Sequence, residues 1–236
     1  MANREVEDSL ITLNNICNGL IQDDPYAVNL KEVEKTVDEQ INVLEKNNKL
    51  SLMIDYYPRC MQRLDETARL VSDYKNAMHF RRRKIVFEEI LLQRKREKGE
   101  KNLSWLLTSI GHNYTDFGEY MFREKMDNTA AFMLGFVAFE TAYTYASTDA
   151  KRRPGPGEIK LLGAITRYFE FCAYRLVRAN GIIQKDHSES LEFIIGKENQ
   201  NVIEIRKPQV QKLSQNTNHI YDRWQGLKKA LQKGMY

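Results

Sequence analysis

Cysteine, proline and glycine are scarce in this chain of 236 residues, which holds 3 cysteines, 5 prolines and 12 glycines. The cysteines at positions 17, 60 and 172 share no common spacing, so the sequence excludes a disulfide scaffold and a zinc ribbon. The low proline and glycine content excludes a collagen-like or low-complexity chain. With 42% apolar and 10% aromatic residues, the chain can build one or two folded domains.

Long apolar runs are also missing. The most apolar stretch, residues 130–146, contains Glu140 and is shorter than the ~20 apolar residues that a transmembrane helix requires. The first residues are polar and acidic and lack the apolar core of a signal peptide. We therefore expect no membrane partner and an intracellular location, nuclear or cytoplasmic, in a reducing compartment.

Motifs that carry catalysis are absent as well. The sequence has no glycine-rich phosphate loop and no nucleophile elbow, and its 4 histidines share no metal-ligand spacing. We therefore expect no enzyme, no catalytic residue, no cofactor and no metal. The alternative is an active site assembled from scattered residues, namely His112, Asp116, Glu119 and Arg123.

Apolar residues recur at helical spacing along most of the chain. Asn47–Lys49 is expected to end the second helix, and Pro58 to begin a third, long helix that Lys98–Asn102 ends. Residues 127–147 are expected to form a helix with a buried aromatic stripe. The stripe consists of Phe132, Phe136, Phe139 and Tyr143.

A polar segment rich in proline and glycine, residues 147–157, predicts a linker. It separates an expected helical domain, residues 1–146, from a smaller C-terminal module, residues 158–236. Within that module two β-branched runs flank a polar turn, which predicts a β-hairpin at residues 191–205. The expected fold is therefore mainly α, a multi-helix bundle with a hairpin in its C-terminal module.

Charge is distributed unevenly along the chain. Residues 1–70 carry 13 acidic and 8 basic side chains, whereas residues 75–101 carry ten Lys and Arg against four Glu. A basic helix of this kind can face an acidic partner or several phosphates, with nonspecific and salt-sensitive binding. The alternative is a solvated helix face with internal ion pairs. The candidate binding residues are Arg81, Arg82, Arg83, Lys84, Arg94, Lys95, Arg96, Lys151, Arg152 and Arg153.

Three stretches resemble subunits of the GINS replication complex. Residues 33–48 look like the GINS helix that ends in Leu-Glu-x-Asn, and residues 73–85 resemble the long GINS helix with an Arg-x-x-Lys-Ile pattern. Residues 193–205, followed by Val210 and Leu213, resemble the strand, turn, strand and helix of the small GINS domain. The resemblance implies a non-catalytic subunit of a hetero-oligomer that bridges helicase and polymerase, without cofactor or active site.

Two functions follow as hypotheses. The first is a non-catalytic helical assembly subunit of a nucleic-acid-processing complex, in DNA replication if the GINS resemblance holds, whose partners are other protein subunits. The second is a nucleic-acid-coating or capsid-type protein, cellular or viral, that binds the phosphate backbone nonspecifically through the basic helix.

Overall fold

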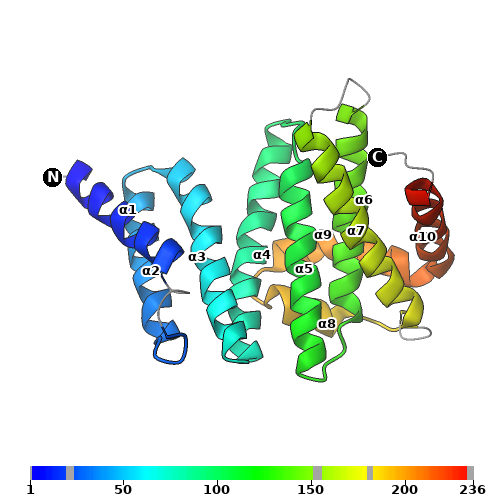
Figure 1. Cartoon of the computed structure of the whole chain (residues 1–236), viewed down its shortest axis with the longest axis horizontal. Coiled ribbons are helices and arrows are strands. Elements are labelled where there is room, and N and C mark those ends of the chain that lie inside the picture. Colours follow the sequence, from blue (N-terminus) through cyan, green and yellow to red (C-terminus); the bar gives the residue numbers. More distant parts are fainter. Residues whose placement is uncertain (1, 20–23, 151–155, 180–182, 233–236) are drawn as a thin grey trace. The chain divides into compact units, whose positions relative to one another are not determined.

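The computed structural model describes residues 2–19, 24–150, 156–179 and 183–232, and within these ranges the chain is helical and has no strand (Figure 1). The prediction of a mainly α fold is therefore confirmed. None of the helices described combines the length and apolar character that a bilayer crossing requires. The helices in these ranges are α1 (Ala2–Gly19), α2 (Leu30–Lys46), α3 (Leu50–Leu70), α4 (Tyr74–Glu97), α5 (Ser104–Arg123), α6 (Thr129–Ala150), α7 (Pro156–Arg178), α8 (Ser188–Ile195), α9 (Gln200–Gln215) and α10 (Thr217–Gln232).

The chain forms two compact units, residues 1–87 and residues 88–236, and the division falls inside α4. In the first unit α1, α2 and α3 pack on one another. In the second, α5, α6 and α7 pack together, while α8 and α9 contact α6 and α10 lies along α7. The sequence places its linker at residues 147–157, of which 147–150 belong to α6 and 156–157 to α7, while 151–155 lie outside the described residues. Helices α6 and α7 pack on each other within one unit.

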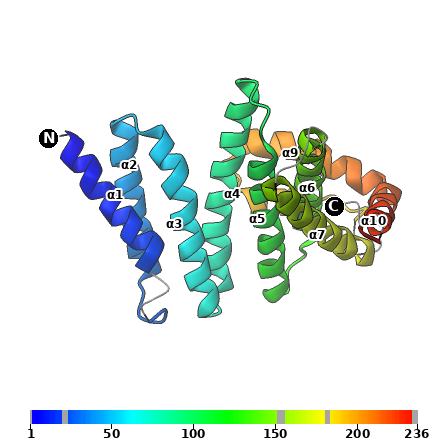
Figure 2. The same ribbon diagram turned by 45° about the horizontal axis from the view of Figure 1, so that its top comes forward.

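The prediction of a β-hairpin at residues 191–205 is wrong, because the segment is helical: Figure 1 labels both α8 and α9, and Figure 2 shows α9 from a second direction. It belongs to α8 and α9, which are separated by a turn that begins at Gly196, where a φ of 91° suits glycine. Leu191, Ile194 and Ile195 are all buried, and their spacing of three and four residues is that of one helix face. Packing of this face on neighbouring helices overrides the preference of β-branched residues for strands.

The long helix predicted from Pro58 onward is two helices. The first, α3, already begins at Leu50, so Pro58 lies inside it. The break between α3 and α4 comes at Ser72, which has a φ of 60° in the left-handed region. Asp73 then caps α4, because its carboxylate accepts a hydrogen bond from the backbone N–H of Asn76 at 3.1 Å. This Ser-Asp pair is a helix start signal, but the apolar periodicity continues across it and so predicts one helix where there are two.

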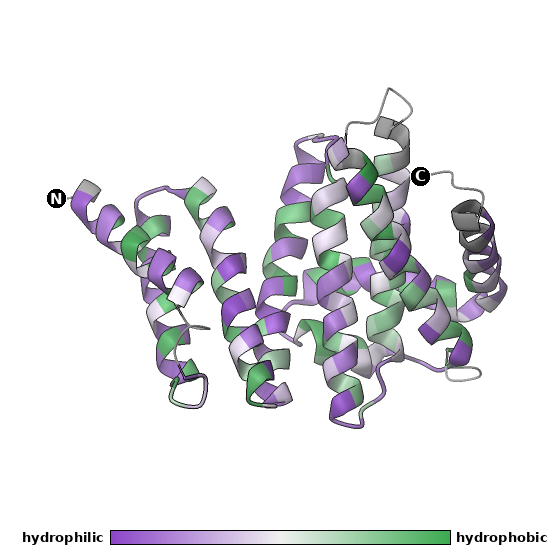
Figure 3. Cartoon of the chain, in the orientation of Figure 1, coloured by the Kyte–Doolittle hydropathy of each residue, from purple (hydrophilic) through white to green (hydrophobic). Residues whose placement is uncertain are grey.

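The predicted aromatic stripe of α6 lies in the core of the second unit. Phe132, Phe136 and Phe139 are fully buried, whereas Tyr143 is half-buried. Residues 129–136 of α6 are all buried, as expected for a helix with neighbours on several sides, and Figure 3 shows apolar residues on the part of α6 in view. Gly111 of α5 lets the two helices approach closely, since a Cβ there would lie only 2.8 Å from the ring of Phe139. The glycine therefore serves packing and does not interrupt α5.

A buried ion pair joins α4 to α9 within the second unit. Arg206 donates from Nε and Nη2 to the two carboxylate oxygens of Glu89 at 2.9 and 2.8 Å, and both residues are at most 2% exposed. The hydroxyl of Tyr114 on α5 donates to the same carboxylate at 2.8 Å. Burial and the nearby charge of Glu89 raise the pKa of Tyr114 well above its usual value. Three helices are thus held together by one satisfied polar cluster.

Replacing Arg206 by Met should destabilise the second unit by about 3–5 kcal/mol, because the carboxylate of Glu89 is left buried without its cation. Adding Glu89→Gln to this variant should recover part of the loss, since the amide is neutral and still accepts from Tyr114. Urea unfolding followed by circular dichroism measures both effects. The control is Lys197→Ala, which removes an ion pair whose lysine is 82% exposed and should change stability by less than about 0.5 kcal/mol. Equal losses of stability in Arg206→Met and in Lys197→Ala would contradict a structural role for the buried ion pair.

Candidate interaction surface

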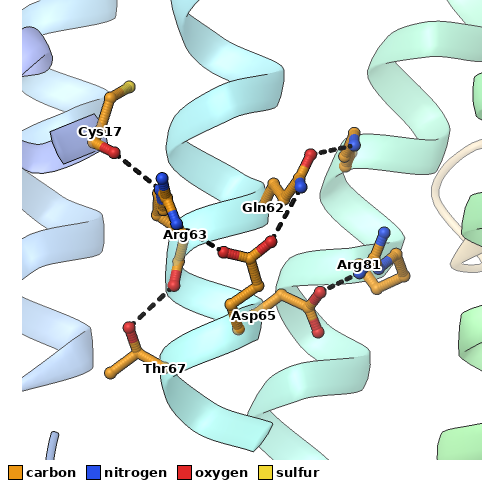
Figure 4. Close-up of polar contacts among 8 residues, drawn as sticks. Cys17, Gln62, Arg63, Asp65, Thr67 and Arg81 are labelled. Atoms are coloured by element: carbon orange, nitrogen blue, oxygen red, sulfur yellow. Dashed lines mark hydrogen bonds and ion pairs between the residues drawn. The ribbon is translucent and has the colours of Figure 1, made fainter. Parts of the chain in front are cut away.

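The first half of the predicted basic cluster is engaged inside the first unit. Arg81 and Lys84 are only 6% and 7% exposed. Arg81 of α4 pairs with the fully buried carboxylate of Asp65 on α3 (Figure 4). Lys84 donates to the side-chain oxygen of Gln62 at 3.0 Å. These two cations therefore join α4 to α3 and are not open to a macromolecular partner.

Arg83 extends the same pattern to α2. Its guanidinium donates to both carboxylate oxygens of Asp38, at 3.1 and 2.6 Å, and also contacts Glu34. It donates through Nε to the hydroxyl of Tyr57 on α3 at 3.0 Å. Arg82 is half-buried and also has an interaction partner. The acidic excess of residues 1–70 thus meets part of the basic excess of α4 within the same unit.

The second half of the predicted cluster lies at the C-terminal end of α4. Arg94 and Arg96 are exposed, whereas Lys95 is half-buried and pairs with Glu100 at 2.5 Å. The remaining candidates, Lys151, Arg152 and Arg153, lie outside the described residues. Among the candidates that the structure describes, Arg94 and Arg96 are therefore the ones presented to solvent.

A different set of side chains forms an exposed surface on the second unit. On α7, Arg167, Phe171, Tyr174 and Arg178 follow one another at intervals of four, three and four residues, which is the spacing of one helix face. Their neighbours on this face come from α5 and α10. We define the α7 surface as Phe122, Arg167, Phe171, Tyr174, Arg175, Arg178 and Trp224.

Arg175 is the fixed centre of the α7 surface. Its Nη2 donates to Glu119 of α5 at 2.7 Å, with both side chains 32% exposed. The guanidinium carbon lies 5.5 Å from the ring centre of Phe122, 5.7 Å from that of Phe132 and 5.1 Å from that of Phe171. Cation–π attraction and the ion pair therefore hold the arginine and these rings in one arrangement.

The other end of the surface is built from α7 and α10. The guanidinium of Arg178 lies 4.4 Å from the ring centre of Tyr174, whose ring is 6.3 Å from that of Trp224. Helix α10 is held in place by Glu140 of α6, which accepts from Nε of Arg223 at 2.7 Å. His219 contacts the same carboxylate at 3.1 Å. Contacts of α10 with α6 therefore position Trp224 beside Tyr174.

Two hollows are lined by residues of this surface. One has a volume of about 400 Å³ and is lined by Arg167, Glu170, Phe171, Tyr174 and Trp224. The other, of about 420 Å³, extends from Phe122 past Arg175 and Arg178 to Lys185. Both combine aromatic walls with exposed cations. This combination suits a side chain or base that presents an apolar face together with negative charge.

Two residues of the alternative active site, His112 and Glu119, pack against or pair with other side chains. The ring of His112 lies 3.7 Å from the ring centre of Tyr168 and 5.4 Å from that of Phe139, and Glu119 is the partner of Arg175. Within the described residues, no group of three His, Cys, Asp or Glu side chains is arranged to hold a metal ion.

No protein-family model matches the chain, and comparisons with curated proteins and with solved structures give no match either. The resemblance to GINS subunits therefore stays a prediction. Its third element changes, because residues 193–205 are helical and not strand, turn and strand.

Replacing Arg81 by Met should destabilise the first unit by about 3 kcal/mol, because it removes the cation beside the buried carboxylate of Asp65. Arg96→Met should change stability by less than about 0.5 kcal/mol, because Arg96 is exposed. Thermal unfolding of both variants measures the difference. If Arg81→Met unfolds like the wild type, the arginine is not structural and the predicted interface at residues 81–84 regains its support.

Acid should weaken the first unit through Glu34. Burial acts to raise the pKa of this carboxyl, but hydrogen bonds from Arg83 and His79 outweigh it and hold the pKa below the usual 4.5. A lowered folded-state pKa contributes stability above the unfolded-state pKa, and this stability is lost as the pH falls through the folded-state value. The melting temperature should therefore fall less steeply below about pH 5 in Glu34→Gln than in the wild type. Glu39→Gln, at an exposed position on the same helix, is the control, and identical slopes in all three proteins would refute the role of Glu34.

Proposed function

We propose that the chain is a non-catalytic helical assembly subunit that binds a partner protein through the α7 surface. The observation that supports this proposal is the exposure of aromatic and arginine side chains on one face, around two hollows. Phe122 is 54% exposed and Tyr174 37% exposed, although both are large and apolar enough to favour burial. Trp, Tyr and Arg are the residues that most often dominate the binding energy of protein interfaces.

The arrangement also lowers the entropic cost of binding. Arg175 is held by Glu119 and by three aromatic rings, so it has little conformational freedom left to lose. A partner segment with an apolar or aromatic anchor and nearby acidic residues would fill a hollow and meet Arg167, Arg178 or Lys185. We therefore propose a segment of this chemistry as the contact on the partner subunit.

The identity of the larger assembly rests on sequence alone. Residues 33–48 and 73–85 resemble GINS subunits, and on that basis we propose a nucleic-acid-processing complex, with DNA replication as the specific case. The α7 surface lies outside these two stretches. The proposal of a partner-binding surface is therefore independent of the proposal about which complex contains it.

A second candidate function is nucleic-acid coating. It is favoured by the exposed Arg94 and Arg96 at the end of α4, and by Tyr174 with Arg178, where a base could stack beside a cation. In this function the buried Arg81 and Lys84 would not contact phosphate, and binding would weaken steeply as salt rises.

Two matched charge reversals distinguish the candidates. Arg167→Glu/Arg178→Glu and Arg94→Glu/Arg96→Glu change the net charge equally and alter only exposed side chains. Each variant and the wild type, tagged, is used to recover partners from the native extract, with and without nuclease. Circular dichroism and melting temperature confirm that each variant is folded.

We expect the Arg167→Glu/Arg178→Glu variant to lose a fixed, nuclease-resistant set of proteins by at least about tenfold, while Arg94→Glu/Arg96→Glu keeps it. Recovery of mainly nucleic acid and the chain itself, dispersed by nuclease and reduced by Arg94→Glu/Arg96→Glu, would instead support nucleic-acid coating. Retention of every protein partner by the α7 variant would refute the α7 surface as the binding site.

A further inference from the structure

Two of the three cysteines face each other in the first unit. Cys17 of α1 and Cys60 of α3 are 2% and 0% exposed, and their sulfur atoms lie 3.3 Å apart. They are 43 residues apart in the sequence, so only the packing of α1 on α3 brings them together. Closing this gap to a disulfide bond of about 2.05 Å requires the two sulfur atoms to approach each other by on the order of 1 Å.

The two sulfur atoms have different surroundings. The backbone oxygen of Cys17 accepts a hydrogen bond from Nε of Arg63 at 2.7 Å (Figure 4). The hydrogen bond from Cys60 and the charges of Arg59 and Arg63 lower the pKa of Cys17 to about 7, although burial opposes the shift. The interaction with Cys17 and burial raise the pKa of Cys60. Of the two thiols, Cys17 is therefore the more readily deprotonated and the expected nucleophile.

We propose that Cys17 and Cys60 are a redox site, which a peroxide converts into an intramolecular disulfide that links α1 to α3. The site lies in the first unit and does not depend on the function proposed for the α7 surface. A thiol reductant returns the pair to two thiols.

The oxidation proceeds in two displacements. The Cys17 thiolate attacks one oxygen of hydrogen peroxide, the O–O bond breaks, and Cys17 becomes a sulfenic acid while hydroxide leaves and takes up a proton. The sulfur of Cys60 then attacks the sulfenic sulfur, the S–O bond breaks, and the second hydroxide leaves as water with the proton of Cys60. Two thiols and one peroxide thus give one disulfide and two waters, with two electrons passing to the peroxide.

Cys172 provides an internal control. It is fully buried in the second unit, and its sulfur lies 3.3 Å from the hydroxyl oxygen of Thr115. Burial raises the pKa of its thiol to about 12. This cysteine should therefore resist the oxidant that converts the pair.

The test treats the full chain with hydrogen peroxide and counts free thiols. We expect the count to fall from three to one, the mass to drop by about 2 Da, and peptide mapping to identify a Cys17–Cys60 link that dithiothreitol reverses. The melting temperature of the first unit should rise on the order of 10 °C, because the link closes a long loop in the unfolded chain. The oxidation rate should reach half of its maximum near pH 7.

Cys172→Ser should form the same link, whereas Cys17→Ser should form none. Three unreacted thiols in the wild type, a link that includes Cys172, or a disulfide between two copies of the chain would each overturn the proposal. The mapping of the wild-type protein decides the question even if a cysteine variant fails to fold.

Discussion

A charge buried in a protein has to be compensated at the place where it lies, and this constraint governs α4. Arg81, Lys84, Glu88 and Glu89 are all buried, and they occur at intervals of three, four and one residue, the spacing that normally marks the apolar face of a helix. Each would cost several kcal/mol in isolation. Each is instead met by a polar side chain of another helix, as the bidentate pair of Glu89 with Arg206 illustrates.

These buried polar pairs contribute more to the choice of one helix arrangement than to its free energy of folding. Apolar burial in the aromatic core supplies most of the favourable free energy, but apolar faces tolerate many relative positions of two helices. A guanidinium that donates two hydrogen bonds to one carboxylate, at 2.8 and 2.9 Å, is compatible with only one relative position of the two helices. We therefore regard the buried charged side chains of α4 as the groups that determine which side chains pack against this helix. Tyr114 constrains the position of α5 in the same way.

The sequence predicts the helical class because periodicity is a local property, and α2 and α4 end directly before the predicted turn residues Asn47 and Lys98. It does not predict which way a charged side chain points. The partner of Arg83, Asp38, is 45 residues away, and that of Arg206, Glu89, is 117 residues away, so a run of arginines resembles a binding patch until the fold brings the acids to it. The hairpin error at 191–205 has the same origin, because tertiary packing decided between strand and helix. The spacing of Arg167, Phe171, Tyr174 and Arg178 was visible in the sequence, but Trp224 joins them only through α10.

The division between the compact units at residues 87 and 88 lies within a continuous helix. A linker between domains can be cut, lengthened or replaced without loss of hydrogen bonds, but a cut at this point would end α4 in mid-course and expose backbone groups on both sides. Neither unit therefore begins or ends at a helix terminus here, so an insertion or a fusion at this boundary would interrupt α4.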